Sequence, residues 1–186
     1  MESEQKTRPR LDNSELVKTG FWVGQVFMLL ATVLGVYLAA QQGLSQAITF
    51  SDIDDQQKNY YLRRSLHDEL ADNVRIVREY ADAVEKERPF DLTEYHPRLQ
   101  TFIWNNMRYS DQTLQTPSEF LTAARRFYAG VDELVGKGEK AIYARAYFVP
   151  RLRALADDME QHTLKDMQAD TDLLKAQLAS LGVTVN

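Results

Sequence analysis

The apolar and polar residues of this 186-residue chain divide it into two parts with different patterns. No Asp, Glu, Lys or Arg lies between Lys18 and Asp52, whereas charged residues recur throughout the rest. Inside this gap, residues 21–40 read FWVGQVFMLLATVLGVYLAA, without proline. An α-helix needs about 20 consecutive apolar residues to cross the hydrocarbon core of a bilayer. The pattern therefore predicts one transmembrane helix near the N-terminus.

Several side chains of this stretch suit a membrane span and its two interfaces. Aromatic rings near both ends favour the headgroup level, and the single strongly polar residue is close to the first interface. A glycine pair with GxxxG spacing begins at Gly20 and allows close approach by a second helix. The residues assigned to the span are Phe21, Trp22, Gly24, Gln25, Tyr37 and Ala40.

The span sets the predicted domain boundaries. We expect a flexible tail over 1–12, a signal-anchor helix over 13–48 with its membrane core at 21–40, and a helical domain over 49–186. Asn13 or Ser14 would cap the first helix, because a short polar side chain accepts hydrogen bonds from free N–H groups. Two alternatives stay open. One is a buried helix of a soluble protein, and the other is a cleaved signal peptide, whose apolar region is usually about 7–15 residues.

Positive charges near the span predict its orientation. The N-terminal side carries Lys6, Arg8, Arg10 and Lys18, whereas acidic residues come first on the other side. Lys and Arg are enriched in cytoplasmic segments beside membrane helices. We therefore expect a single-pass protein of the inner cell membrane with a cytoplasmic N-terminus. The C-terminal domain would be periplasmic or extracytoplasmic.

Beyond the span, apolar residues recur every three or four positions, as on one face of an α-helix. The first such run predicts a long helix near 52–88, capped at Ser51 or Asp52 and ended by Pro89. Its inward residues are Leu62, Leu66, Leu70, Val74, Val77, Ala81 and Val84. A shorter helix would begin at Pro97 and end near Tyr109. Its inward residues would be Leu99, Phe102, Ile103 and Met107.

Thr116, Pro117 and Glu119 form a capping-box pattern, which predicts the start of the next helix. Its inward face holds Phe120, Ala124, Phe127, Val131, Leu134 and Val135. Gly136 and Gly138 would end that helix.

The last long helix is expected near 139–181, with a kink or restart near Phe148 because of Pro150. Gly182 would stop it. Its predicted inward positions are Leu152, Leu155, Met159, Thr163, Met167, Asp170, Leu174, Leu178 and Leu181. No stretch alternates with the period of a strand. The pattern predicts an all-α fold, in which an antiparallel bundle of about four helices follows the transmembrane helix.

Composition narrows the chemistry. The absence of Cys excludes disulfides, thiolate metal sites and a Cys nucleophile. No Glu-x-x-His or His-x-x-x-His spacing occurs among the three His residues. Asp158, His162 and Asp166 share a helix face and are candidates for a cation site or a pH-sensitive pair. A solvated His beside helix-face acids is the ordinary alternative. We expect no cofactor and no enzymatic activity.

The remaining candidates point to protein contacts. Aromatic and Arg side chains are enriched in the residues that dominate binding interfaces. The candidates of this kind are Trp104, Arg108, Tyr143, Arg145, Arg151 and Arg153. Beyond Lys18 the chain carries 18 basic and 23 acidic residues, a balance that argues against nucleic-acid binding. We predict a non-catalytic scaffold, accessory or regulatory subunit that contacts the bilayer and a protein partner or its own copies. The alternative is a ligand- or ion-sensing helical bundle.

Overall fold

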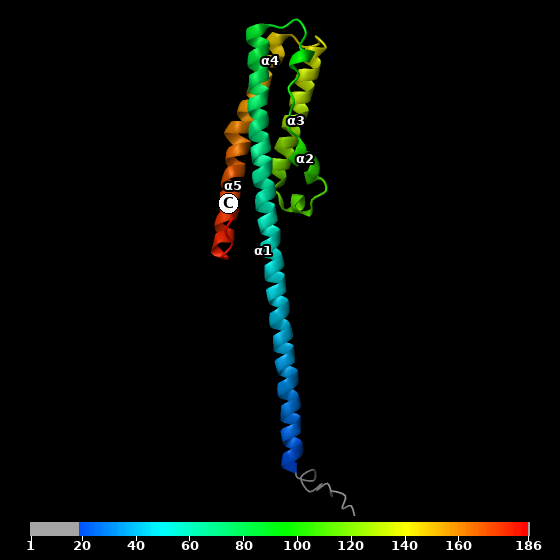
Figure 1. Cartoon of the computed structure of the whole chain (residues 1–186), viewed down its shortest axis with the longest axis vertical. Coiled ribbons are helices and arrows are strands. Elements are labelled where there is room, and N and C mark those ends of the chain that lie inside the picture. The colour runs from blue at the N-terminus through cyan, green and yellow to red at the C-terminus, as the bar shows by residue number, and fades with distance from the viewer. Residues whose placement is uncertain (1–18, 186) are drawn as a thin grey trace, which may run out of the picture. The chain divides into compact units, whose positions relative to one another are not determined.

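The computed structural model describes residues 19–185, and this part of the chain contains helices but no strand (Figure 1). The all-α prediction is therefore confirmed over the described residues. The chain divides into two compact units, Met1–Phe50 and Ser51–Asn186. The predicted tail over 1–12 and the caps Asn13 and Ser14 lie outside the described residues.

Helix α1, Thr19–Glu87, contributes to both units. It is the one helix of the described part that is long and apolar enough to cross a membrane, a property that a signal sequence near the N-terminus shares. The predicted break and new cap at Ser51 or Asp52 are wrong, because α1 continues through them. The hydroxyl of Thr49 donates to the Ser45 carbonyl at 3.0 Å. The Thr49 side chain therefore bonds to the carbonyl four residues earlier in α1, which is how a Thr is accommodated inside a helix.

In the C-terminal unit, α1 buries the face that the spacing predicted. Leu66, Leu70, Val77, Ala81 and Val84 are fully or almost fully buried. They belong to one core, to which α3, α4 and the following segments also contribute. Burying such a row of side chains is the main stabilising term for a long amphipathic helix.

Shorter elements and two further long segments complete this unit. In chain order after α1 they are η2 Thr93–Tyr95, α2 Phe102–Met107, η3 Asp111–Gln115, α3 Ser118–Glu139, α4 Arg145–Asp158, η4 Met159–Leu164 and α5 Lys165–Ser180. Helices α3 and α4 are in contact, and the predicted inward residues of α3 are buried or partly buried.

Helix α3 begins where predicted, but not by the predicted cap. The hydroxyl of Thr116 donates to the Gln112 carbonyl at 3.2 Å, so it closes the preceding turn. Pro117 has an extended ψ of 130° and takes the N-cap position, without a side-chain cap. The capping box of Thr116 and Glu119 is thus absent, because the η3 turn uses the Thr116 hydroxyl.

Gly138 of α3 serves packing instead of termination, whereas a Cβ atom on Gly136 would meet no atom within 4 Å. A Cβ atom on Gly138 would lie 2.8 Å from the Phe148 ring of α4, so only glycine permits this approach. Helix α3 continues to Glu139 and closes with a Schellman motif, in which Ile142 N–H bonds the Lys137 carbonyl at 2.9 Å. The left-handed residue of that motif is Ala141, with φ of 55°. The break between the helices is therefore at 140–144.

The segment predicted as one helix over 139–181 is α4, a π-helical turn and α5. Helix α4 begins at Arg145 and continues through Pro150, so the observed restart lies three residues before the position predicted near Phe148. The π turn η4, Met159–Leu164, adds a residue to one turn.

This extra residue changes which side chains face the core. Met159 and Leu164 are buried five positions apart, and burial then continues at Met167, Thr171 and Leu174. The predicted inward position Thr163 is wrong for this reason, since the π turn places Leu164 in the core instead. Asp170 is also wrong, because Thr171 takes the buried position between Met167 and Leu174. Thr163 and Asp170 are only partly buried.

Helix α5 ends at the position that Gly182 predicted. Gly182 has φ of +81°, and Val183 N–H donates to the Leu178 carbonyl at 2.9 Å, which completes a Schellman motif. Leu181 is exposed, contrary to prediction. Val185 instead packs with Leu178 and with Tyr60 of α1 in a small second core.

Candidate interaction surfaces

A buried carboxylate of α1 holds the start of helix α2. The side chain of Glu69 is almost fully buried. Its Oε2 accepts from Ile103 N–H at 2.6 Å, and its Oε1 accepts from Trp104 N–H at 3.0 Å. These are free N–H groups of the first turn of α2, so Glu69 caps that helix from another element. The Tyr128 hydroxyl of α3 also donates to Glu69 Oε1, at 2.9 Å.

Asn73, one turn further along α1, binds the chain just before α2. Its Nδ2 donates to the Gln100 carbonyl at 2.6 Å, and Gln100 N–H donates to its Oδ1 at 2.7 Å. The same Nδ2 donates to the Tyr128 hydroxyl at 3.0 Å. Glu69, Asn73 and Tyr128 thus form a polar cluster that joins α1, α3 and the 100–104 backbone. A fully connected buried network of this kind fixes one local arrangement.

Burial keeps the Tyr128 hydroxyl protonated. Burial raises the pKa of Tyr128 far above its usual range, and the neighbouring charge of Glu69 raises it further. The hydroxyl therefore remains a hydrogen-bond donor at neutral pH. The Trp104 ring covers Tyr128, with ring centroids 5.6 Å apart.

The polar cluster explains why the predicted helix from Pro97 to Tyr109 is wrong. Only Phe102–Met107 is helical. Gln100 gives its N–H and C=O groups to Asn73, which prevents a helix before α2. As a result Phe102, expected to face inward, has 75% of its surface exposed.

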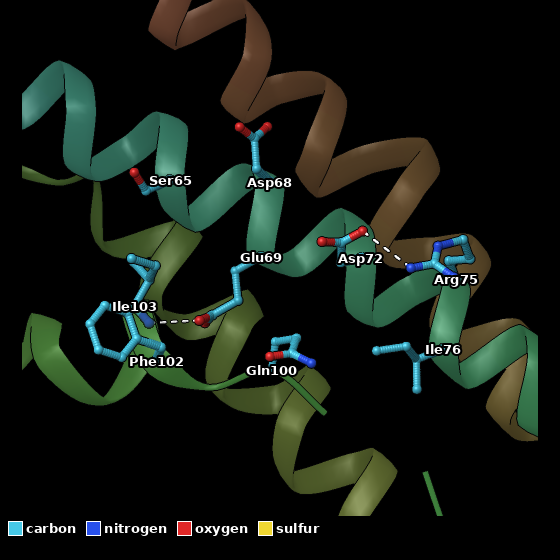
Figure 2. A pocket seen from close by; sticks show the side chains of 9 residues that line it. All are labelled: Ser65, Asp68, Glu69, Asp72, Arg75, Ile76, Gln100, Phe102 and Ile103. Atoms are coloured by element: carbon cyan, nitrogen blue, oxygen red, sulfur yellow. Dashed lines mark hydrogen bonds and ion pairs between the residues drawn. The ribbon is translucent and has the colours of Figure 1, made fainter. Parts of the chain in front are cut away.

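An open groove of about 420 Å³ lies beside the polar cluster. Figure 2 shows α1 along one wall, with Glu69 reaching toward the backbone at Ile103, and the 100–103 segment along the other. Nine residues line the groove: Ser65, Asp68, Glu69, Asp72, Arg75, Ile76, Gln100, Phe102 and Ile103. The apolar part of the lining comes from Ile76, Phe102 and Ile103.

The lining of this groove has an acidic excess. The lining includes three acidic residues, Asp68, Glu69 and Asp72, and one cation, Arg75. Arg75 is 3.5 Å from Asp72 but 2.9 Å from Glu79, so Glu79 is its nearer carboxylate. Outside the lining, Arg64 and His67 approach Asp68 at 3.4 Å and 3.0 Å. The exposed pairs are weak, so the groove remains suited to a cation.

Trp104 and Arg108, two candidates from the sequence, differ in exposure. Trp104 is half-buried against the core and Tyr128, so it is chiefly a packing residue. Arg108 is exposed just after α2. The exposed aromatic residue at the groove is Phe102, which the sequence interpretation had placed inside.

The candidates around Pro150 are largely used within the chain. Arg153 pairs with Asp82 at 2.7 Å and Glu85 at 2.6 Å. Arg151 stacks on the Tyr147 ring, 3.5 Å from its centroid. Tyr143 packs on Tyr147, with centroids 4.6 Å apart.

Arg145 donates to the Pro89 carbonyl and so joins the turn after α1 to the start of α4. Arg145 also lines a cavity. This cavity, of about 390 Å³, is also lined by Arg88.

The proposed cation candidates do not converge. His162 Nδ1 is 3.0 Å from Asp158 Oδ1, and both side chains are exposed. The described residues contain no group of three His, Cys, Asp or Glu side chains that could hold a metal ion. Asp166 follows the π turn, which rotates it relative to the spacing that the sequence implied.

The residues assigned to the span all lie in the N-terminal unit. Phe21 and Trp22 pack edge to face, with ring centroids 5.9 Å apart. Trp22, Gly24, Tyr37 and Ala40 are exposed. A Cβ atom on Gly24 would meet no atom within 4 Å, so its surface is open to a second helix or to lipid.

The sequence interpretation missed the polar cluster. Glu69 and Asn73 are four residues apart, beside the inward residues Leu70 and Val74. Two polar residues beside a row of core-facing residues indicate a buried hydrogen-bonding site, since buried polar groups need partners. Their partners, the 100–104 backbone and Tyr128, are distant in sequence and carry no such signal.

No protein-family model, curated protein or solved structure matches this chain.

Proposed function

We propose that this chain is a single-pass membrane-anchored protein whose helical unit acts as a non-catalytic scaffold, accessory or regulatory subunit. In this proposal residues 21–40 cross the inner membrane, the N-terminus is cytoplasmic, and Ser51–Asn186 is an extracytoplasmic antiparallel bundle. The length of the uncharged helical segment and the excess of Lys and Arg before it support this arrangement.

The observation that carries the proposed role is the exposed Phe102 beside a groove held rigid by buried hydrogen bonds. Exposed aromatic residues in preformed grooves are typical anchors of protein interfaces. The acidic excess from Asp68 and Asp72 is complementary to positive charge. We therefore assign this groove to a protein segment that presents an apolar side chain flanked by Lys or Arg.

Site-specific photocrosslinking tests this role in membranes. A photoreactive residue at Phe102 should give one stoichiometric adduct, whereas the same residue at the exposed Leu173 should not. Adding Asp68→Lys and Asp72→Lys should reduce the Phe102 adduct several-fold, because the complementary charge is reversed. A chain that stays monomeric and gives no Phe102 adduct would contradict the proposal. Equal adducts at Phe102 and Leu173 would do the same.

A further inference from the structure

Two turns meet at the end of the C-terminal unit where α1 ends and α4 begins (Figure 1). The first follows Glu87 and the second covers 140–144. The side chain of Arg145 donates to the Pro89 carbonyl, which ties the two turns together. We call the surface formed by Arg88, Phe90, Lys140, Ile142 and Arg145 the turn surface.

The turn surface exposes apolar side chains from both turns. Phe90 is fully exposed, and Ile142 is also exposed. Neither belongs to a core cluster of the described residues. Large apolar side chains this open to water on adjoining turns are typical of contact sites.

The turn surface carries three cations, Arg88, Lys140 and Arg145, and Glu87 and Glu139 directly precede two of them in the chain. A cavity of about 390 Å³ is lined by Arg88 and Arg145, together with Glu85 and apolar side chains. Glu85 is already paired with Arg153 at 2.6 Å. Arg145 donates to a neutral carbonyl. In the part of the chain that the structure describes, Arg88 and Lys140 make no ion pair.

Backbone strain occurs in the same two turns. Arg88 and Ala141 have φ of 50° and 55°, and they are the two non-glycine residues with positive φ among those described. Left-handed backbone at non-glycine residues is energetically unfavourable and clusters at functional sites. At Ala141 this conformation closes the Schellman motif of α3, and at Arg88 it directly follows the last residue of α1.

We propose that the turn surface binds an acidic protein segment, independently of the groove at Phe102. A carboxylate of that segment pairs with the planar guanidinium groups of Arg88 and Arg145, which suit bidentate contacts. An apolar side chain of the segment covers Phe90 and Ile142. This apolar contact favours a peptide over a nucleic acid or a free anion, because neither of these brings an aliphatic side chain to the exposed Phe90 and Ile142.

Fluorescence anisotropy of the full chain in nanodiscs, with a short labelled peptide rich in Glu and Leu, tests this proposal. Arg88→Glu and Phe90→Ser should each weaken binding about tenfold or more. Both side chains lie at the surface, so the fold should persist, which circular dichroism checks. Arg125→Glu, at an exposed Arg of α3, is the matched control and should bind as the unchanged chain does.

Several outcomes would overturn the proposal. One is the absence of saturable binding, and another is an equal loss in Arg125→Glu, which indicates nonspecific attraction. Equal binding of a peptide with Ser in place of Leu would show that only an anion is recognised. Binding of phosphatidylglycerol vesicles without binding of the peptide would assign the surface to lipid. Phe102→Ser should leave the peptide affinity unchanged. A negative result for the turn surface would therefore not bear on the proposed role of the groove at Phe102.

Discussion

Tyr80 is a buried phenol and Tyr128 a partly buried one, and their hydroxyl groups have different surroundings. The Tyr128 hydroxyl bonds Glu69 and Asn73. The Tyr80 hydroxyl has no hydrogen-bond partner among the described residues. Burial raises the pKa of Tyr80 to about 12, with the charge of Glu139 adding to the shift and that of Arg145 opposing it. An unpartnered buried hydroxyl costs free energy, so Tyr80 is a weak point of the core.

Tyr80→Phe is therefore expected to preserve or raise the free energy of unfolding at neutral pH, by up to about 1 kcal/mol. The folded-state pKa lies above the value of 10.0 for a free tyrosine. The protonated Tyr80 hydroxyl therefore contributes its full share to the free energy of unfolding below pH 10.0. This contribution is lost as the pH rises through about 12. Between about pH 9 and 11 the unchanged chain should lose about 1 kcal/mol relative to Tyr80→Phe.

Urea unfolding of the full chain in detergent at several alkaline pH values measures this difference. Tyr109→Phe, at an exposed tyrosine, is the matched control and should follow the unchanged chain. If Tyr80→Phe lowers stability at neutral pH, the hydroxyl has a partner. If its pH profile parallels that of the unchanged chain, the proposed linkage is wrong.

Single residues also mark the limit of prediction from sequence. Gly182 was predicted correctly as a helix stop, because its role depends on local backbone conformation alone. Gly138 was misread, because its role depends on Phe148, which packs against it from another helix. Glu69 was missed for the same reason. Its partners, Ile103 and Trp104, are far away in sequence.

At the scale of elements, long amphipathic helices were predictable and irregular turns were not. The spacing in α1 and α3 identified their buried faces, because 3.6-residue periodicity depends only on the helix itself. Helix α2 was overextended, since tertiary hydrogen bonds to Asn73 hold the chain before it in an extended form. The sequence analysis did not predict the π turn, although the polar residues Thr163 and Asp170 at expected core positions indicated an irregular helix. Regular spacing placed these two polar residues in the core.

The π turn gives a test of the helical register. Deleting Gln161, an exposed residue within Met159–Leu164, should convert the π turn into a regular α-helical turn. The buried residues Met159 and Leu164 would then be four positions apart, and the downstream face would keep its orientation. We expect the free energy of unfolding to change by no more than about 1 kcal/mol.

Deleting the exposed Asp172 is the matched control, because it lies in regular α-helix. This deletion should rotate Leu174 and Leu178 away from the core and cost about 3 kcal/mol or more. Thermal unfolding of both variants in detergent compares them. The assigned register is wrong if deletion of Gln161 is as damaging as deletion of Asp172.

At the scale of the whole molecule, the distribution of charge separates the two units more clearly than the average composition does. The mean hydropathy of −0.43 combines an uncharged N-terminal helical stretch with a highly charged helical unit. Residues 26–50 are all exposed, so none of their apolar side chains is buried against another part of the described chain. Exposing such a stretch to water is unfavourable, and a bilayer would remove this cost.

Two double substitutions test where the bilayer lies along α1. Leu30→Arg with Leu34→Arg places charges in the middle of residues 21–40, where each Arg costs about 2.5–3.5 kcal/mol. This pair should move the chain out of the carbonate-resistant membrane fraction. Leu44→Arg with Ile48→Arg adds the same charges beyond the predicted span and should leave the chain in that fraction. Equal behaviour of the two pairs would contradict a span at 21–40.

Orientation and processing can be followed in the same preparations, because the chain has no Cys and Thr184→Cys supplies a single thiol. A membrane-impermeant maleimide should label this thiol in intact cells, since we place the helical unit outside the cytoplasm. Labelling that requires permeabilised membranes would reverse the proposed orientation. An intact mass that retains residues 21–40 is expected for an anchor. Loss of these residues would identify the stretch as a cleaved signal, and the helical unit would then need a protein partner to remain at the membrane.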